Sequence, residues 1–397
     1  MFLDVLRRRN PQLIEQAIAL HQAGKLPANA YVIDLDSVEA NARGIADAAT
    51  RLGLTAFAMT KQMGRNASFC AAVMRGGIGK AVAVDMECAR AAHRSGLKIG
   101  HIGHLTQVPR HEADAAAAFE PDYWTVFNLE KANEAGVASR KRDRLQPLLA
   151  RIRAEGDQFY RGHEGGFLAS EITAVADALD GIGGARFAGI TTFPALLFDP
   201  VSRKVKPTPN LETLRKTAEA LAHSGRPKIE INAPGTTSSS TLAALAEAGA
   251  TQIEPGQGLT GTTPLHAVED LPERPAVVYL SEVSHLVGGE AFCFGGGLYS
   301  DPVFPDYQVK AIVSREATAA AAALLNVEFP APAAIDYYGM IEARGISKPR
   351  PGDSVVFGFR PQAFVTRAYV VGVTGLSRMQ PSVEPFYDAF GRQIEWP

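Results

Sequence analysis

The strongest constraint on the fold is a regular alternation of two kinds of segment. From residue 31 to about residue 262, short apolar or β-branched runs alternate with alanine-rich stretches of helical period, which is typical of β-α units around a parallel sheet. After a first run at 31–35, strand-like runs occupy residues 56–60, 81–84, 98–102, 123–127, 148–152, 187–192, 228–232 and 251–254. These eight runs predict an α/β fold, a (β/α)8 barrel of the TIM type. Helix candidates include residues 37–52, with Ser37 as the N-cap.

The sequence changes character beyond Pro264. Runs at 276–280, 308–313 and 354–359 alternate with glycine and proline turns, so a C-terminal mostly-β domain is predicted. The run at 31–35 precedes the first barrel strand, and we expect it to pair with that domain. The predicted domains are an N-terminal helical segment at 1–28, the barrel at 29–264 and the β domain at 265–397.

Composition narrows the class of partner. The 397 residues are 46% hydrophobic and carry a formal charge of −2, which leaves no basic excess for nucleic acid or an anionic membrane. The three cysteines, Cys70, Cys88 and Cys293, are too few and too scattered for a disulfide framework or a structural zinc cluster. Glu15 and Gln16 interrupt the N-terminal apolar stretch, so it fits neither a signal peptide nor a membrane span. We expect a cytoplasmic protein that acts on a small molecule.

Two loops offer a phosphate site. In barrels of this kind, phosphate commonly binds after strands seven and eight. The loop at 232–241 is rich in hydroxyls and precedes a helix predicted at 242–248, and the loop at 256–260 is rich in glycine. Unpaired N–H groups at a helix start attract anions, although a Ser/Thr-rich turn at such a place can also be simple capping.

Lys61 and Glu254 end the first and eighth predicted strands. A lysine amine there can form a Schiff base with an aldehyde cofactor, whereas the alternative is an ordinary exposed lysine. A buried Glu254 needs a cationic partner, which the protonated ring nitrogen of pyridoxal 5'-phosphate would supply. A cationic ring is a strong electron sink for a carbanion at the substrate Cα. A salt bridge from Glu254 to Arg153 is the alternative.

These residues together resemble the alanine-racemase-like fold (fold type III) of pyridoxal-phosphate enzymes. Val32–Asp36 with Asn41 is similar to its opening strand and helix, and Ala58–Lys61 to its cofactor-lysine segment. The resemblance implies that Phe193 stacks on the cofactor ring. It also implies phosphate-binding positions at Thr236, Thr237, Ser238, Gly256 and Gly258.

Some positions depart from parts of that group. Racemases have an arginine where this chain has Glu254, whereas the decarboxylase-like members have Glu-Pro-Gly, as here. Those decarboxylases continue with a phosphate-binding arginine, which is Gln257 in this chain, so backbone and hydroxyls are expected to hold the phosphate. Residues 359–364 lack the His-x-Cys zinc pair of D-serine dehydratases, and we expect no metal. His101 and His104 have no carboxylate or thiolate near them in the sequence and are interpreted as a polar wall of the barrel mouth.

Racemisation requires acid/base groups on both faces of a planar carbanion. Lys61 is one, and the resemblance implies that the other comes from the C-terminal domain of the partner subunit, in a homodimer with shared active sites. Candidates are Tyr299, Tyr337 and Cys293, although a cysteine such as Cys293 is more often an inert buried thiol, and Tyr337 can be a core residue. Arg161 and Arg153 are candidates for binding the substrate carboxylate.

The sequence therefore predicts a pyridoxal-phosphate-dependent amino-acid racemase. A decarboxylase or lyase on the same scaffold is the alternative within enzymes. A protein that binds the cofactor without catalysis is the alternative from another class.

Overall fold

The structure, a computed structural model, describes residues 1–343 and 348–396 and divides into two compact units. The barrel unit comprises Ala42–Thr60 and Val73–Gly258. The β unit comprises Met1–Asn41, Lys61–Ala72 and the chain from Leu259 onward. Neither unit is continuous in sequence, because the chain passes between them within the first 73 residues and again at Gly258.

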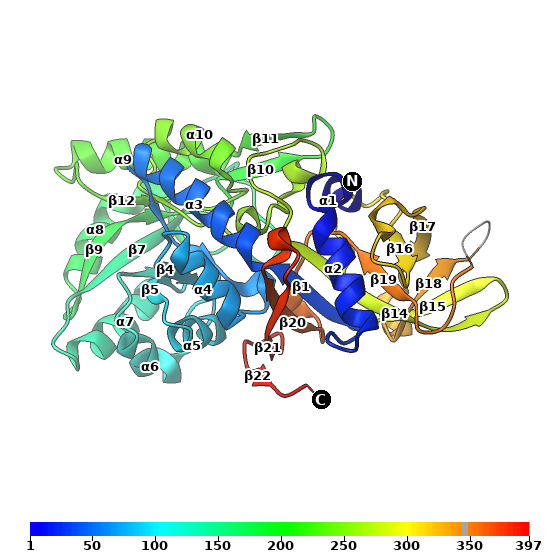
Figure 1. Cartoon of the computed structure of the whole chain (residues 1–397). Helices are drawn as coiled ribbons and strands as arrows, with labels where there is room; N and C mark the ends of the chain where they lie inside the picture. The colour runs from blue at the N-terminus through cyan, green and yellow to red at the C-terminus, as the bar shows by residue number, and fades with distance from the viewer. Residues whose placement is uncertain (344–347, 397) are drawn as a thin grey trace. The chain divides into compact units, whose positions relative to one another are not determined.

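The barrel unit contains a parallel sheet that closes on itself. Its strands are β2 (Thr55–Ala56), β3 (Ala58–Met59), β4 (Lys80–Ala83), β5 (Lys98–Ile102), β6 (Tyr123–Val126), β7 (Gln146–Arg153), β9 (Ala185–Thr191), β12 (Glu230–Asn232) and β13 (Gln252–Ile253). They follow the order β2-β13-β12-β9-β7-β6-β5-β4-β3, with β8 (Phe167–Leu168) added beside β7. Because β2 and β3 are successive pieces of one extended segment, the ring has eight strand positions, and the predicted barrel is confirmed. In Figure 1 the strands β4, β5, β7, β9 and β12 lie together, with helices around them.

Phe57 joins β2 to β3 and fills the inside of the barrel. Its N–H donates to the Ile253 carbonyl at 2.9 Å and the Met59 N–H donates to the Pro255 carbonyl at 2.8 Å, so pairing with the last strand continues past the break. Its side chain is fully buried. A Cβ on Gly100 would lie 2.3 Å from the Phe57 ring, so only glycine fits opposite it.

Helices alternate with the barrel strands. They are α3 (Leu35–Arg51), α4 (Ala67–Arg75), α5 (Met86–Arg94), α6 (Ala113–Ala118), α7 (Leu129–Arg140), α8 (Ile172–Asp180), α9 (Pro209–His223) and α10 (Leu242–Glu247), and a hairpin of β10 (Leu196–Asp199) and β11 (Lys204–Pro207) precedes α9. The predicted cap at Ser37 is wrong, because Asp34 precedes α3 and accepts hydrogen bonds from the Ser37 N–H and hydroxyl at 3.1 and 2.6 Å. Among the described helices, none is both long and apolar enough to span a bilayer.

The β unit is built on one large sheet. Its strands are β1 (Ala30–Asp34), β14 (Val277–Val287), β15 (Glu290–Phe294), β16 (Lys310–Ser314), β17 (Leu325–Glu328), β18 (Tyr338–Glu342), β19 (Ser354–Phe357), β20 (Tyr369–Thr374), β21 (Ser382–Tyr387) and β22 (Gln393–Ile394). The order is β15-β18-β17-β16-β19-β14-β1-β20-β21-β22, and β14 pairs with β15 as well, so the strands from β14 to β19 form a ring. β1 lies between β14 and β20, with Ala30 opposite Leu280 and Tyr369, which confirms the predicted pairing of the run at 31–35.

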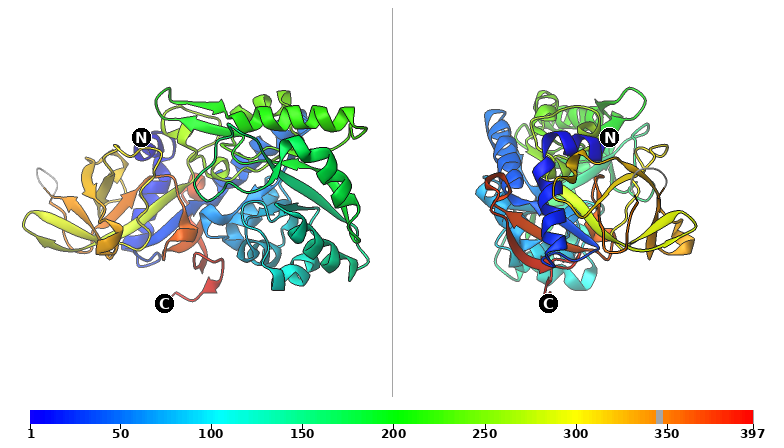
Figure 2. Two further views of the ribbon diagram at one scale, coloured as in Figure 1. Left: turned by 180° about the vertical axis from the view of Figure 1, so that it is seen from behind. Right: turned by 45° about the vertical axis from the view of Figure 1, so that its right-hand side comes forward.

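Two N-terminal helices, α1 (Phe2–Arg9) and α2 (Pro11–Gln22), pack against this sheet (Figure 2). Their apolar faces share one core with strands β1, β14, β19 and β20, and its fully buried members include Leu6, Leu13, Ile14, Ile18, Val32, Val278, Val356 and Val371. Burying each such side chain contributes about 1.5–3 kcal/mol. The helices at the start of the chain are therefore part of the core of the β unit.

Candidate active site

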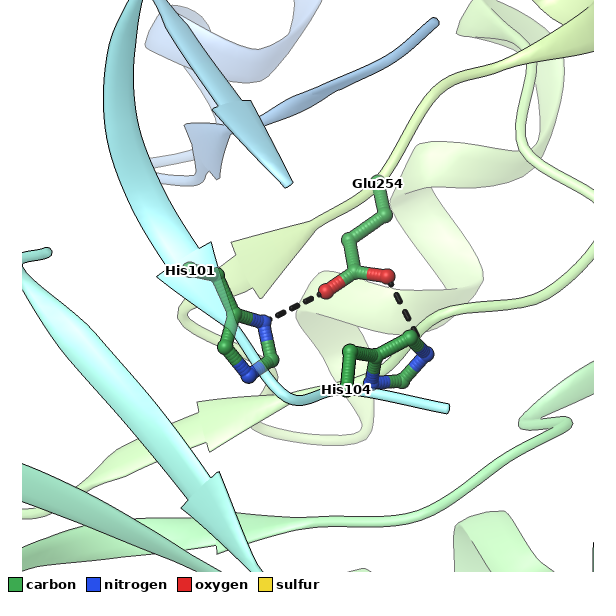
Figure 3. Close-up of side chains that lie close together, drawn as sticks. All are labelled: His101, His104 and Glu254. Atoms are coloured by element: carbon green, nitrogen blue, oxygen red, sulfur yellow. Dashed lines mark hydrogen bonds and ion pairs between the residues drawn. The ribbon is translucent and has the colours of Figure 1, made fainter. Parts of the chain in front are cut away.

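A buried carboxylate lies at the end of the last barrel strand. Glu254 follows β13 directly and is only 4% exposed. Its Oε1 lies 2.7 Å from Nδ1 of His101, on β5, and accepts a 3.1 Å hydrogen bond from Nδ2 of Asn232, on β12. Its Oε2 lies 3.2 Å from Nε2 of His104, just beyond β5. The three side chains point toward one another (Figure 3).

Further side chains fix the partners of Glu254. Nε2 of His101 lies 2.5 Å from the hydroxyl of Thr125, on β6, and the Thr191 hydroxyl donates to Oδ1 of Asn232 at 2.7 Å. All four of these residues are fully buried. Oε1 therefore has two firmly held partners, whereas Oε2 accepts no hydrogen bond from the residues that the structure describes.

The structure excludes the alternative partner of Glu254 and adds to the interpretation of the two histidines. Arg153 does not pair with Glu254, because its Nε donates to the Gly166 carbonyl at 3.3 Å. His101 and His104, interpreted as a polar wall without a carboxylate near them in the sequence, both lie beside Glu254 in the fold. Glu254 is 153 residues from His101 in sequence. The carboxyl ends of all strands of a closed parallel barrel lie at the same end of the barrel, which brings the two residues together.

Arg151 is a site residue that the sequence analysis missed. It lies on β7, is fully buried, and donates from one terminal nitrogen to the carbonyls of His163 and Phe193 at 2.9 and 3.3 Å. Its Nε and other terminal nitrogen have no acceptor within the described ranges 1–343 and 348–396. Burial lowers the pKa of Arg151 to about 10, and the charge of Glu254 opposes that shift. A buried guanidinium with two unused donors is suited to binding an anionic group.

Phe193 forms part of an aromatic wall just beyond β9. Its ring centroid lies 5.8 Å from those of His104 and Tyr160 and 5.9 Å from that of His163. This wall is compatible with the stacking position expected for Phe193. Arg161 has a different environment, because its side chain is 99% exposed and pairs with Glu164 at 3.2 Å.

The two loops expected to bind phosphate touch each other. Thr237 and Ser238 are buried in the loop after β12, where the Ser238 N–H donates to the Thr241 hydroxyl at 3.0 Å. A Cβ on Gly258 would lie 2.4 Å from the Thr237 carbonyl oxygen. Only glycine at position 258 therefore lets the loop after β13 approach the first loop this closely. Thr236 lies on the first loop, and Gly256 and Gln257 on the second. The helix α10 that follows has six residues, so backbone N–H groups and hydroxyls are the donors available here.

Lys61 lies two residues beyond β3 and begins the 3-10 turn η1 (Lys61–Met63). It is partly buried within the β unit. Its Nζ lies 4.9 Å from the ring centroid of Phe364, in the turn η9 (Ala363–Val365). The amine therefore lies over the face of an aromatic ring.

The three candidates for a second acid/base differ in environment. Tyr299 is partly buried, and burial raises its pKa while the neighbouring Arg360 lowers it. Cys293 is fully buried in β15, and burial raises the pKa of its thiol to about 12, which favours the inert-thiol alternative. Tyr337 is 65% exposed, and its ring centroid lies 5.9 Å from the guanidinium of Arg367.

His101, His104 and Glu254 are residue types that bind metal ions, and one donor atom from each lies within 4.8 Å of the others. Ligands of a tetrahedral zinc ion, bound at about 2.0–2.1 Å, are roughly 3.3 Å apart. The 2.7 Å between His101 Nδ1 and Glu254 Oε1 is shorter and is the length of a hydrogen bond. The geometry therefore favours direct pairing of the imidazole with the carboxylate.

Comparison with known families agrees with this architecture. Residues 33–264 match the alanine racemase N-terminal domain family, and residues 278–383 match the YhfX-like C-terminal domain family. The chain therefore belongs to the alanine-racemase-like family of fold type III pyridoxal-phosphate proteins. It is 37% identical over 399 residues to the uncharacterized protein YhfX of Escherichia coli strain K12, covering 99% of this chain and 100% of that protein.

Solved structures share the fold at low sequence identity. D-threonine aldolase from Filomicrobium marinum is 16% identical with a TM-score of 0.69, covering 93% of this chain and 96% of that one. D-threo-3-hydroxyaspartate dehydratase from Delftia sp. HT23 is 16% identical with a TM-score of 0.66, covering 91% and 97%. Alanine racemase of Clostridium difficile 630, in complex with cycloserine, is 12% identical with a TM-score of 0.62, covering 92% and 99%.

Members of this family depend on pyridoxal phosphate, and the residues of the barrel unit fit that cofactor. Oε2 of Glu254 is available to a ring N–H, and Arg151 has buried donors without acceptors in the described part of the chain. The contact of Gly258 with Thr237 brings together two loops that can surround a phosphate. A buried carboxylate, a buried cation and a polar loop pair match the three polar parts of the cofactor.

Proposed function

We propose that this protein is a pyridoxal-phosphate-dependent enzyme that acts at the Cα of an amino acid, with racemisation as its reaction. The observation that carries the proposal is the environment of Glu254, a carboxylate buried at the end of the eighth barrel strand. Its Oε1 is held by two partners, and its Oε2, 3.2 Å from Nε2 of His104, accepts no hydrogen bond from the described residues. A carboxylate so placed favours a cationic ligand.

When bound, pyridoxal phosphate supplies a conjugated ring that withdraws electrons from the Cα of an attached amino acid. In this proposal Lys61 would be the residue that holds the cofactor through its aldehyde group, and its amine would carry the Cα proton on one face. Glu254 holds a proton at the ring nitrogen, and Arg151 donates to an anionic group in the barrel. Phe193 shields the ring from water, while Thr237 and Ser238 bind the phosphate.

Tyr299 is the proposed second proton carrier, contributed by the partner in a homodimer. Burial raises its pKa, so its hydroxyl carries a proton at neutral pH and can return one to Cα. Cys293 is too deeply buried for this role, and Tyr337 is largely exposed in a single chain. The fold neighbours include a racemase, an aldolase and a dehydratase by name, so the class of substrate is an amino acid in each of these comparisons.

Decarboxylation or another lyase reaction is the second candidate. It is supported by the sequence Glu254-Pro255-Gly256, because a ring held cationic stabilises a Cα carbanion however that carbanion arises. Chiral analysis of products separates the candidates. Inverted amino acid without carbon dioxide or ammonia supports racemisation, and release of either gas supports the lyase reaction. A bound cofactor without turnover on any amino acid would support a non-catalytic binding protein.

Lys61→Ala tests the proposal directly. We expect loss of the near-visible absorbance band of the lysine-bound cofactor and loss of turnover by at least about 10⁴-fold, because both the covalent link and one acid/base group disappear. Lys25→Ala, at another lysine of the β unit, is the control and should retain both. Full turnover in Lys61→Ala would refute the mechanism.

Tyr299→Phe and Cys293→Ala compare two candidates for the second proton carrier. We expect Tyr299→Phe to lower kcat for racemisation by about 10²–10⁴-fold, the usual contribution of a general acid or base, with the cofactor band unchanged. Cys293→Ala should leave kcat within a few-fold, because a buried neutral thiol carries no proton to the substrate. The reverse result would assign the role to Cys293.

A further inference from the structure

A buried chain of three side chains connects three barrel strands. The Thr125 hydroxyl lies 2.5 Å from Nε2 of His101, and Nδ1 of His101 lies 2.7 Å from Oε1 of Glu254. Thr125 and His101 are 0% exposed and Glu254 is 4% exposed. Water does not compete for these contacts, so each one affects the next.

The chemistry of the three groups assigns their protons. An ionised carboxylate only accepts hydrogen bonds, so Nδ1 of His101 is the donor to Glu254. A neutral imidazole then has an acceptor at Nε2, which the Thr125 hydroxyl satisfies as a donor. This arrangement gives both imidazole nitrogens of His101 a partner while the ring stays neutral.

A second donor reaches the same carboxylate oxygen. Nδ2 of Asn232 donates to Oε1 of Glu254 at 3.1 Å, and Asn232 is itself held by the Thr191 hydroxyl at 2.7 Å. Two donors on Oε1 fix the orientation of the carboxylate. The other oxygen accepts no hydrogen bond from any described residue, and Nε2 of His104 lies 3.2 Å from it.

We propose that His101 is a positioning residue that orients the Glu254 carboxylate and presents its Oε2 to the ring nitrogen of bound pyridoxal phosphate. The inference rests on the proposed function and adds a residue to it. His101 acts through Glu254 and does not itself contact the cofactor. Its effect is therefore specific to the nitrogen of the ring, whereas a space-filling residue would affect any ring of that size.

Two ligands that differ only at the ring nitrogen test this role of His101. Pyridoxal phosphate and its 1-deaza analogue, in which a CH group replaces the ring nitrogen, have nearly the same shape but only the first can donate to Glu254. The dissociation constant of each compound is measured for the apo form of the wild type, His101→Met, His101→Asn and Thr125→Val. The decisive quantity is the ratio of the two constants, the preference for the ring nitrogen.

We expect His101→Met to reduce this preference by about ten-fold or more, the usual effect of a hydrogen bond to a charged group. His101→Asn should restore much of it, because the asparagine amide places an N–H near the position of Nδ1. Thr125→Val should reduce it less, since it removes only the partner that fixes the imidazole tautomer. His93→Met, which replaces an exposed histidine of α5, is the control and should leave the preference unchanged.

Equal weakening of both compounds in His101→Met would show that His101 only fills space and would overturn the inference. If that variant does not fold, His101→Asn and Thr125→Val decide the question. A wild-type preference in Thr125→Val, together with an unrescued loss in His101→Asn, contradicts the proton assignment.

Metal binding is a separate test. One Zn²⁺ bound per apo chain, and lost in both His101→Asn and His104→Ala, would make the cluster a metal site and also overturn the inference. Failure of the wild type to bind either compound would instead refute the proposed function, and the role of His101 with it.

Discussion

Each unit contains an arginine whose side chain is largely removed from solvent, Arg151 fully buried and Arg360 14% exposed, and the two differ in their acceptors. In the β unit, a terminal nitrogen of Arg360 donates to Asp301 Oδ1 at 2.9 Å, and its Nε lies 2.8 Å from Oδ2. In the barrel unit, Arg151 pairs with no carboxylate of the described chain and has only backbone carbonyls as acceptors. The charge of Arg360 is neutralised by a carboxylate of the same unit, so this arginine needs no ligand. An arginine left unmatched in a barrel interior indicates a place where a ligand supplies the anion.

Arg360→Met gives the largest expected effect on this comparison. It leaves the Asp301 carboxylate buried without its cation, so the free energy of unfolding should fall by about 3–5 kcal/mol. Urea denaturation followed by circular dichroism measures the change. Combining Arg360→Met with Asp301→Leu should recover most of the loss, because neither charge then remains. A single variant as stable as the wild type would show that the pair is not a structural one.

Arg151→Met should have the opposite pattern. The affinity of the apo-protein for pyridoxal phosphate is expected to fall by about 1.5–3 kcal/mol, roughly ten-fold to a hundred-fold, because donors to an anionic group are lost. Stability without the cofactor should stay the same or rise, since an apolar side chain replaces an unmatched buried charge. Absorbance titration and urea denaturation measure the two effects. Arg153→Met is the control, and an equal loss of affinity in it would remove the distinction between the two arginines.

The smallest expected effect, on the pH dependence of stability, comes from His21. This buried histidine of the β unit remains neutral, in contrast to the charged arginines. Its Nδ1 lies 2.7 Å from the Ser354 hydroxyl and its Nε2 lies 3.3 Å from Glu282, and burial lowers its pKa. The unfolded chain therefore takes up a proton near pH 6.5, before the folded chain does, and stability falls as pH decreases from 7 through that range. The slope for one proton is at most about 1.4 kcal/mol per pH unit.

His21→Gln should flatten this slope between pH 7 and pH 5 in urea denaturation series. Burial raises the pKa of Glu282, so the folded chain gains a proton there before the unfolded chain does. That contribution has the opposite sign and remains in the variant. An unchanged slope in His21→Gln would mean that another group controls the acid sensitivity.

The sequence predicted the barrel because its strands are local features, each a short apolar run between helical stretches. The pairing of 31–35 with the C-terminal strands was also predictable, since the run precedes the first barrel strand. Arg151 was missed because it lies inside the apolar run at 148–152, where a buried cation is rare. The pairing of His101 with Glu254 was missed because the two residues are 153 positions apart. Over such a separation, sequence patterns do not indicate which residues face each other.

The position of β1 between β14 and β20 has a consequence for synthesis. Ala30 leaves the ribosome long before its neighbours Leu280 and Tyr369. At about 5–20 residues per second, this short apolar strand waits on the order of ten seconds to a minute with both edges uncovered. Until the last third of the chain emerges, the newly made polypeptide carries an unpaired strand that can associate with other chains. A fragment that ends after the barrel would keep this strand unpaired permanently.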